Sequence, residues 1–480
     1  MWGGANDIFF QLGALGAGAI TPAQLQANVI GAAGSLARQV GILNAAGARY
    51  IVVFNLPDIG RTPSGAASGQ AAQISAISGL YNTALIGGLD ALGAPTIRVN
   101  IQALLNEVEA NPAAFGIANV TTPACGTTPS LLCTRTNLVA PNAASTFLFA
   151  DGVHPTSAGH ALIAQAVESM IEGPAKIGVL AEAPLAVEQA TFRAIDSRMI
   201  SALDAPVPRG KFQAWASYDY GRNDFDGRFV SGSADVNTVS AGGDIKVTEH
   251  MLVGGAFGYA DDRGDFGAGS GGYTLRETTG TAYIGYGKGP WYVGATLGAG
   301  DLDFRDVHRN FDLGALSRTE SGETRGWHAM ASVLGGYWFG YASVLHGPFV
   351  RFAYQQIRVK GFAERGDDST ALIYGEQNRK SFISTLGWQV SGRIGNVRPF
   401  ARVGWEIEGK DDNRFVSASS VALGGNYSIP ALTPDNNYLR YAAGASADFG
   451  RVTGYLVGSA TSGRSDGNGY GITVGVRVPL

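Results

Sequence analysis

Apolar and polar side chains alternate with a period of two along most of the chain from residue 210 onward. In the last segment one face is apolar and the other is small or polar: Tyr470, Ile472, Val474, Val476, Val478 and Leu480 alternate with Gly471, Thr473, Gly475 and Arg477. Similar alternation runs through 291–298 and 381–393. Successive side chains of a strand point to opposite faces, so this pattern predicts strands with one apolar face.

About twelve such segments can be counted, at 211–220, 236–248, 251–261, 273–287, 291–304, 323–340, 346–360, 377–393, 397–407, 437–449, 451–461 and 469–480. Short joins alternate with long ones rich in Asp, Gly, Arg and Asn, at 221–235, 262–272, 305–322, 361–376, 408–436 and 462–468. Apolar-out strands with short turns at one end and long loops at the other are typical of barrels in lipid. We therefore predict a twelve-stranded antiparallel transmembrane β-barrel over 210–480, closed so that no backbone group is unpaired in the bilayer. The alternative is a soluble β-sandwich or propeller.

Residues 1–175 follow a different pattern, in which helical stretches alternate with short apolar runs. Thr21 and Pro22 are a helix N-cap and first-turn proline, and this helix is expected to reach about Gly47. The apolar run 49–57 ends at a proline and suits a buried parallel strand. Further helices are expected at about 70–92, up to 110 and at 157–172, with Ser157 as the last N-cap, and further strands at 96–101 and 147–149. Such alternation indicates an α/β domain.

The segment 176–209 connects the two halves. Its stretch 183–203 has helical propensity, with no glycine or proline after Pro184, and its faces mix polar with apolar residues. A helix that threads a polar barrel lumen would have this composition, and an ordinary linker helix is the alternative.

Composition narrows the possible functions. The 480 residues carry a net charge of −4, so no nucleic-acid partner is expected. No apolar run reaches eighteen residues, which argues against a transmembrane helix. The first ten residues lack a basic region and include Asp7, so they do not form a secretory signal. Because an exported barrel requires one, we expect the natural N-terminus to be missing.

The only two cysteines, Cys125 and Cys133, lie close together. In an exported protein such a pair predicts a disulfide that closes a small surface loop, and two unpaired thiols are the alternative. Zinc is not expected, because no second Cys or His pair stands at ligand spacing. We expect neither a metal nor a cofactor.

Two short motifs could support hydrolysis. Asp151 precedes His154 by three residues in a loop, where a carboxylate could orient an imidazole that moves protons. Gly4 and Asn6 could donate a backbone N–H and a side-chain amide to a developing oxyanion. Taken singly, an ordinary surface histidine and an Asn/Asp turn or cap are the alternatives.

Together, and in this order, these motifs resemble the SGNH, or GDSL-type, hydrolases. The stretch WGGANDIFF is similar to the third block of that family, which implies an oxyanion role for Gly4 and Asn6. The stretch FADGVHPTSAGHALIA is similar to the fifth block, which implies that Asp151 and His154 complete a catalytic triad. FNLPDIGRTP, at 54–63, is similar to the middle region.

With a barrel following, the whole chain resembles the autotransporter esterases and lipases of Gram-negative bacteria. That resemblance implies a barrel in contact with outer-membrane lipid, inserted by the barrel assembly machinery. It also implies a passenger on the cell surface that acts on ester or lipid substrates without a cofactor.

The chain departs from the family at the nucleophile, which is a serine in a Gly-Asp-Ser block upstream of the third block. Residues 1–175 contain no Gly-Asp-Ser, and the Gly-x-Ser-x-Gly at 463–467 lies in a predicted barrel loop without the strand–helix context of a nucleophile elbow. We therefore expect an incomplete passenger with no nucleophile in this chain, inactive alone, while the full-length protein uses a Ser-His-Asp mechanism. The rival interpretation is a non-enzymatic autotransporter that displays an adhesive or degenerate passenger.

Overall fold

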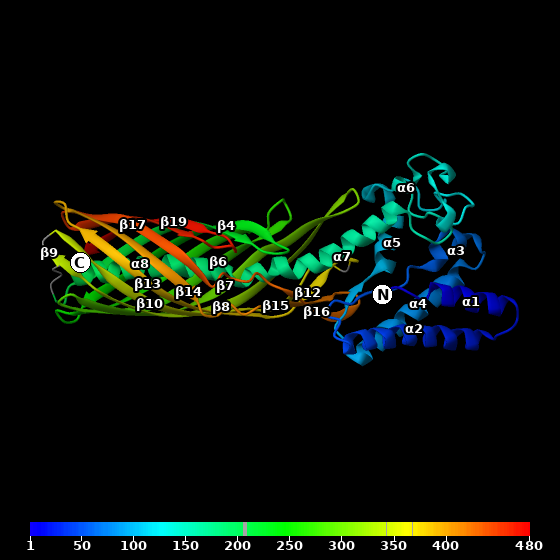
Figure 1. Cartoon of the computed structure of the whole chain (residues 1–480), viewed down its shortest axis with the longest axis horizontal. Coiled ribbons are helices and arrows are strands. Elements are labelled where there is room, and N and C mark those ends of the chain that lie inside the picture. Colours follow the sequence, from blue (N-terminus) through cyan, green and yellow to red (C-terminus); the bar gives the residue numbers. More distant parts are fainter. Residues whose placement is uncertain (205–208, 342, 367) are drawn as a thin grey trace.

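The computed structural model shows a helical N-terminal part joined end to end with a long barrel (Figure 1). It describes residues 1–204, 209–341, 343–366 and 368–480. Residues 205–208, at the end of the predicted 176–209 connection, lie outside the described residues.

The N-terminal part is built from helices around a small parallel sheet. Strands β1 (Val52–Phe54) and β2 (Ile97–Val99) pair in parallel. The other elements are α1 (Ala5–Gly16), α2 (Pro22–Ala45), η1 (Ile59–Arg61), α3 (Pro63–Ala67), α4 (Ala71–Leu92), α5 (Ile101–Ala110), η2 (Pro112–Phe115), η3 (Ser130–Leu132), η4 (Arg135–Asn137), α6 (Ala143–Thr146) and α7 (Ser157–Gly178). The sequence patterns did not predict α1.

Helix starts follow from local capping. Thr21 and Gln24 form a reciprocal capping box at α2, with Pro22 in the first turn, as predicted. Helix α7 begins at Ser157, as expected, but its N-cap is Thr156, not Ser157. The Thr156 hydroxyl accepts from the Gly159 N–H at 3.2 Å and donates to the Phe147 carbonyl at 2.6 Å, so it also fixes the preceding chain.

Twelve long antiparallel strands form a closed barrel. The ring runs β3 (Phe212–Asp226), β4 (Ser231–Lys246), β5 (Met251–Asp265), β6 (Gly271–Lys288), β7 (Trp291–Leu313), β8 (Leu316–Tyr337), β10 (Val344–Val359), β13 (Gln377–Gly392), β14 (Val397–Glu408), β17 (Asn437–Phe449), β18 (Val452–Ser462) and β19 (Gly469–Pro479). Pairing of β19 with β3 and of β10 with β13 closes it. The three-residue β9 (Phe339–Tyr341) pairs only with β10, at one end. The predicted twelve-stranded barrel is confirmed.

The barrel wall has an apolar outside and a polar inside, as the alternation predicted. Ile472 and Val474 are exposed on the outer surface, whereas Thr473 between them is buried. On β13, Leu386 and Trp388 face outward and Gln389 inward. The outer surface therefore presents hydrocarbon and the lumen presents hydrogen-bonding groups.

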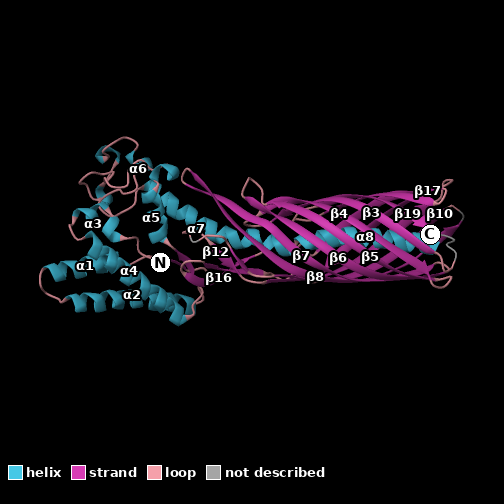
Figure 2. Cartoon of the chain, turned by 180° about the vertical axis from the view of Figure 1, so that it is seen from behind, coloured by secondary structure: helices cyan, strands magenta, loops and turns pink. Residues whose placement is uncertain are grey.

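Helix α8 (Ala183–Asp204) lies inside the barrel, and the short η5 (Val179–Ala181) connects it to α7 (Figure 2). Ion pairs fix it to the wall: Arg193 Nη2 lies 2.9 Å from Asp219 Oδ1, and Arg198 Nε lies 2.6 Å from Asp244 Oδ2. Polar residues on a helix in a polar bore account for the mixed faces of this segment. Within the described residues, no helix combines the length and apolarity needed to cross a bilayer.

The barrel wall continues beyond its ring toward the N-terminal part. The expected loop 305–322 is instead the extended end of the β7–β8 hairpin. The expected loops 361–376 and 408–436 contain a small sheet of β11 (Phe362–Ala363), β12 (Leu372–Tyr374), β15 (Phe415–Ser420) and β16 (Gly424–Pro430). We call these segments the barrel extension. One apolar core runs from β2, α5 and α7 into the extension, so the two parts are packed together.

Candidate active site

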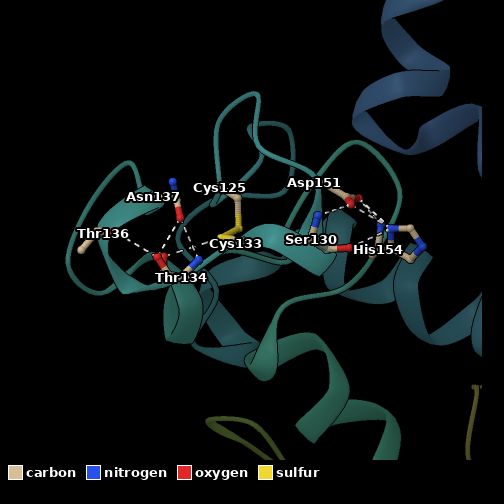
Figure 3. Close-up of a disulfide and its surroundings, with 8 residues drawn as sticks. All are labelled: Cys125, Ser130, Cys133, Thr134, Thr136, Asn137, Asp151 and His154. Atoms are coloured by element: carbon tan, nitrogen blue, oxygen red, sulfur yellow. Dashed lines mark hydrogen bonds and ion pairs between the residues drawn. A yellow bond between two sulfur atoms is a disulfide. The ribbon is translucent and has the colours of Figure 1, made fainter.

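Asp151 and His154 lie in a tight turn between a short bridge and helix α7 (Figure 3). The Asp151 carboxylate accepts from the backbone N–H of Val153 at 3.0 Å and of His154 at 2.9 Å. The His154 carbonyl accepts from the Ala150 N–H at 2.7 Å, which closes the turn. The turn brings the imidazole back onto the carboxylate, with Nδ1 3.0 Å from Oδ1 and 2.9 Å from Oδ2.

The Asp151 side chain is mostly buried, whereas that of His154 is exposed. Side-chain exposure is 15% for Asp151 and 63% for His154. Burial acts to raise the pKa of the Asp151 carboxyl, but hydrogen bonds from the backbone N–H groups of His154, Val153 and Ser130 outweigh it and hold that pKa well below its usual range. Asp151 is therefore a carboxylate at neutral pH, and Nδ1–H of His154 donates to it. Among the described residues, none makes a hydrogen bond to Nε2.

Gly4 and Asn6 lie at the start of α1, where Gly4 is the N-cap residue with φ +108°. A Cβ at Gly4 would lie 2.2 Å from the Tyr81 ring, so the backbone approaches that ring too closely for any side chain. Burial, reinforced by the charge of Asp7, raises the pKa of Tyr81 to about 12. Asn6 is exposed, one position into the helix.

Among the described residues, no hydrogen bond joins Gly4 or Asn6 to Asp151 or His154. The structure connects them through β1 and the segment that follows. The Phe54 N–H of β1 donates to the Met1 carbonyl at 3.0 Å, and the Ser64 N–H of α3 donates to the Gly152 carbonyl at 2.9 Å.

Two further features surround the Asp151–His154 pair. Cys125 and Cys133 are joined by a disulfide, with their Cα atoms 5.9 Å apart. Within the loop that this disulfide closes, Ser130 contacts both members of the pair, which sequence reasoning missed. In the described part of the chain, no group of three or more His, Cys, Asp or Glu side chains is arranged to hold a metal ion.

Comparison with known families agrees with both halves of this picture. Residues 214–459 match the family model of the autotransporter beta-domain. Residues 1–167, which include the turn at Asp151, match that of the GDSL-like lipase/acylhydrolase family. The chain belongs to the autotransporters that carry a GDSL-type passenger. An autotransporter barrel resides in the outer membrane of a Gram-negative bacterium, and its passenger is displayed on the cell surface.

Two curated relatives align with most of the chain. The esterase EstA of Pseudomonas aeruginosa is 32% identical over 414 residues, which cover 83% of this autotransporter; the chain spans only 64% of that relative's length. Lipase 1 of Photorhabdus luminescens is 24% identical over 536 aligned residues, covering 97% of this chain and 79% of the relative.

Among solved structures, the translocator domain of the autotransporter NalP from Neisseria meningitidis is similar to the barrel. It has a TM-score of 0.51 and 16% sequence identity, and the match covers 64% of this chain and 99% of that one. At this identity the likeness concerns the fold: a closed barrel.

Proposed function

We propose that the passenger of this autotransporter is a carboxylic ester hydrolase displayed on the cell surface. The observation that carries the proposal is the orientation of His154: its Nδ1 faces the Asp151 carboxylate, and its Nε2 is left for another group. An imidazole in this state accepts a proton at Nε2 from a hydroxyl nucleophile and returns it to the leaving alcohol. The Asp151 carboxylate stabilises the imidazolium that forms in between.

In the same proposal, Gly4 and Asn6 stabilise the oxyanion of the tetrahedral intermediate. Removal of one such donor in other hydrolases costs about 3–4 kcal/mol of transition-state stabilisation. In this proposal the nucleophile is the serine of a Gly-Asp-Ser block, a motif that residues 1–175 do not contain. The chain alone is therefore expected to be inactive. Its substrates are esters or lipids that reach the cell surface, and the barrel assembly machinery inserts the barrel.

The first assay measures hydrolysis of p-nitrophenyl butyrate by the chain in detergent micelles, where we expect no activity above background. The second uses a chimaera in which a segment with the family's Gly-Asp-Ser block precedes Met1. The chimaera should hydrolyse the ester, and His154→Ala or Asp151→Ala should lower kcat at least about a hundredfold. His160→Ala is the matched control, since among the described residues the hydrogen bond of that ring is to the Thr156 carbonyl, away from the Asp151–His154 pair.

Activity of the chimaera that survives His154→Ala would refute the assigned roles. Activity of the unmodified chain that His154→Ala abolishes would show that the nucleophile lies within the 480 residues. If a protein that contains the Gly-Asp-Ser block is correctly displayed on the cell surface and still hydrolyses no ester, the non-enzymatic alternative is favoured. That alternative is an adhesive or degenerate passenger.

A further inference from the structure

The loop closed by the Cys125–Cys133 disulfide lies against the Asp151–His154 turn (Figure 3). Its first arm is fixed to the residues directly before Asp151. The Ala124 N–H donates to the Phe149 carbonyl and the Cys125 N–H to the Ala150 carbonyl, each at 2.8 Å. The loop therefore starts from a defined position beside the carboxylate.

The second arm places Ser130 on the pair itself. The Ser130 N–H donates to Asp151 Oδ2 at 2.8 Å, and its Oγ lies 3.2 Å from His154 Nδ1. Ser130 opens the short helix η3, which ends just before Cys133, and the Cys133 N–H donates back to the Ser130 carbonyl at 3.2 Å. Only Leu131 and Leu132 lie between Ser130 and Cys133, so the disulfide leaves Ser130 little freedom to move.

The geometry excludes Ser130 as the nucleophile of the proposed reaction. Its Oγ lies on the Nδ1 side of the imidazole, which Asp151 already occupies. A nucleophile has to face Nε2, the nitrogen that takes its proton. Ser130 acts on the same side as the carboxylate, which is where a group that fixes the ring would sit.

We infer that Ser130, clamped by the Cys125–Cys133 disulfide, is a positioning residue that holds the Asp151 carboxylate and the His154 ring in one orientation, with Nε2 free. This inference deepens the proposed ester hydrolase and rests on it for its catalytic meaning. The contact itself exists whether or not the passenger turns over an ester.

The electrostatic consequence is specific to this contact. The Ser130 N–H is one of the donors that lower the pKa of Asp151 against the effect of burial. Losing it should bring that pKa back toward the value of an ordinary aspartate. A residue that merely filled space in the loop would leave the titration of Asp151 unchanged.

Four variants separate the two contacts of Ser130. Ser130→Pro removes both the N–H and Oγ, and the ψ of 144° at Pro129 is compatible with a following proline. Ser130→Ala removes only Oγ, whereas Ser130→Thr keeps both groups. The control is Thr136→Ala: Thr136 lies just beyond the disulfide, and its hydroxyl hydrogen-bonds, among the residues that the structure describes, to Thr134 alone, at 2.8 Å.

The readout is NMR of the full chain in detergent micelles, with labelled histidine nitrogens and aspartate carboxyl carbons. The chain has six histidines, and His154→Gln and Asp151→Asn identify the two signals. In wild type, Ser130→Thr and Thr136→Ala, we expect the His154 ring to show a single tautomer, with its proton on Nδ1. Ser130→Pro, which lacks both groups, should raise the midpoint of the Asp151 titration and mix the two His154 tautomers. Ser130→Ala should mix the tautomers with a smaller rise of that midpoint, because it keeps the N–H. Cys125→Ser combined with Cys133→Ser should produce both changes.

Unchanged titration and tautomer in both Ser130→Pro and Ser130→Ala would overturn the inference, even if hydrolysis by an active protein depends on His154. Altered spectra together with absent hydrolysis would instead refute the proposed function and leave the contact established. In an active protein, Ser130→Ala should lower kcat about tenfold, with recovery in Ser130→Thr, because the His154 ring loses the Oγ contact that holds it in one orientation.

Discussion

Arg309 joins the barrel extension to the passenger helix α7, and its replacement should loosen that junction. Its guanidinium pairs with the Glu364 carboxylate through two parallel bonds of 2.6 and 2.8 Å. It also donates to the carbonyls of Ser169 on α7 at 3.0 Å and of Thr370 at 2.7 Å. Both side chains are almost fully buried, at 1% and 3% exposure.

Arg309→Met should lower the local free energy of unfolding by about 3–5 kcal/mol, because removing one partner leaves a buried charge uncompensated. Glu364 would retain the Tyr374 hydroxyl and the Leu372 N–H, each at 2.8 Å, but no cation. Adding Glu364→Gln removes the uncompensated negative charge and keeps an oxygen that accepts hydrogen bonds. The double variant should therefore recover about 1–3 kcal/mol of the loss.

The assay is hydrogen–deuterium exchange of the α7 amides in detergent micelles. A loss of 3–5 kcal/mol corresponds to exchange that is about a hundred to a few thousand times faster. Arg305→Met is the matched control on the same strand: Arg305 is 53% exposed and pairs with Asp303 at the surface, so its loss should cost at most about 1 kcal/mol. The heat-dependent gel mobility of the barrel should not change in any variant. Equal effects of Arg309→Met and Arg305→Met, or no recovery in the double variant, would refute the reasoning.

Three further predictions concern the passenger. Gly4→Ala should lower its stability to urea by about 1–3 kcal/mol, because φ is +108° and the new Cβ meets the Tyr81 ring; an unchanged midpoint would contradict this. Asp151→Asn should be less stable than wild type at pH 7, and the difference should shrink progressively as the pH falls below about 4, because a carboxylate with a lowered folded-state pKa loses its stabilising effect only as that pKa is passed; a difference that stayed constant between pH 5 and pH 2 would argue against it. Replacing Cys125 and Cys133 by serine should cost about 2.5 kcal/mol in the same urea experiment through loop entropy, and no loss would mean that the loop is ordered without its crosslink.

The barrel was predictable because each strand has one face toward lipid and one toward a polar lumen. Apolar and polar residues therefore alternate along the sequence with a period of two. The extension was not, because the apolar side switches there. On β7, Trp291, Val293 and Leu297 face outward, but further along Leu302 and Phe304 face inward. The alternation continues along the strand, but the apolar side chains change from the outer face to the inner face. A search for strands with an apolar outer face therefore does not find the barrel extension.

In the candidate site, contacts between residues close in sequence could be predicted, and contacts between distant residues could not. Asp151 and His154 are three residues apart, so a turn alone brings them together and sequence can suggest it. Ser130 lies 21 residues before Asp151 in an irregular segment, and no spacing rule connects them. Helix α1 was missed because its start at Gly4 has no side-chain cap and it exposes Phe10.

Because α7 and the barrel extension share an apolar core, the passenger should stay attached to the barrel even if the peptide chain between them is cut. A protease that severed the peptide between η5 and α8 would leave the Arg309 junction and the hydrogen bond from the Thr96 N–H to the Asn426 carbonyl, at 2.9 Å, in place. The nicked halves would remain one particle on the cell, so release into the medium would require dissociation as well as cleavage.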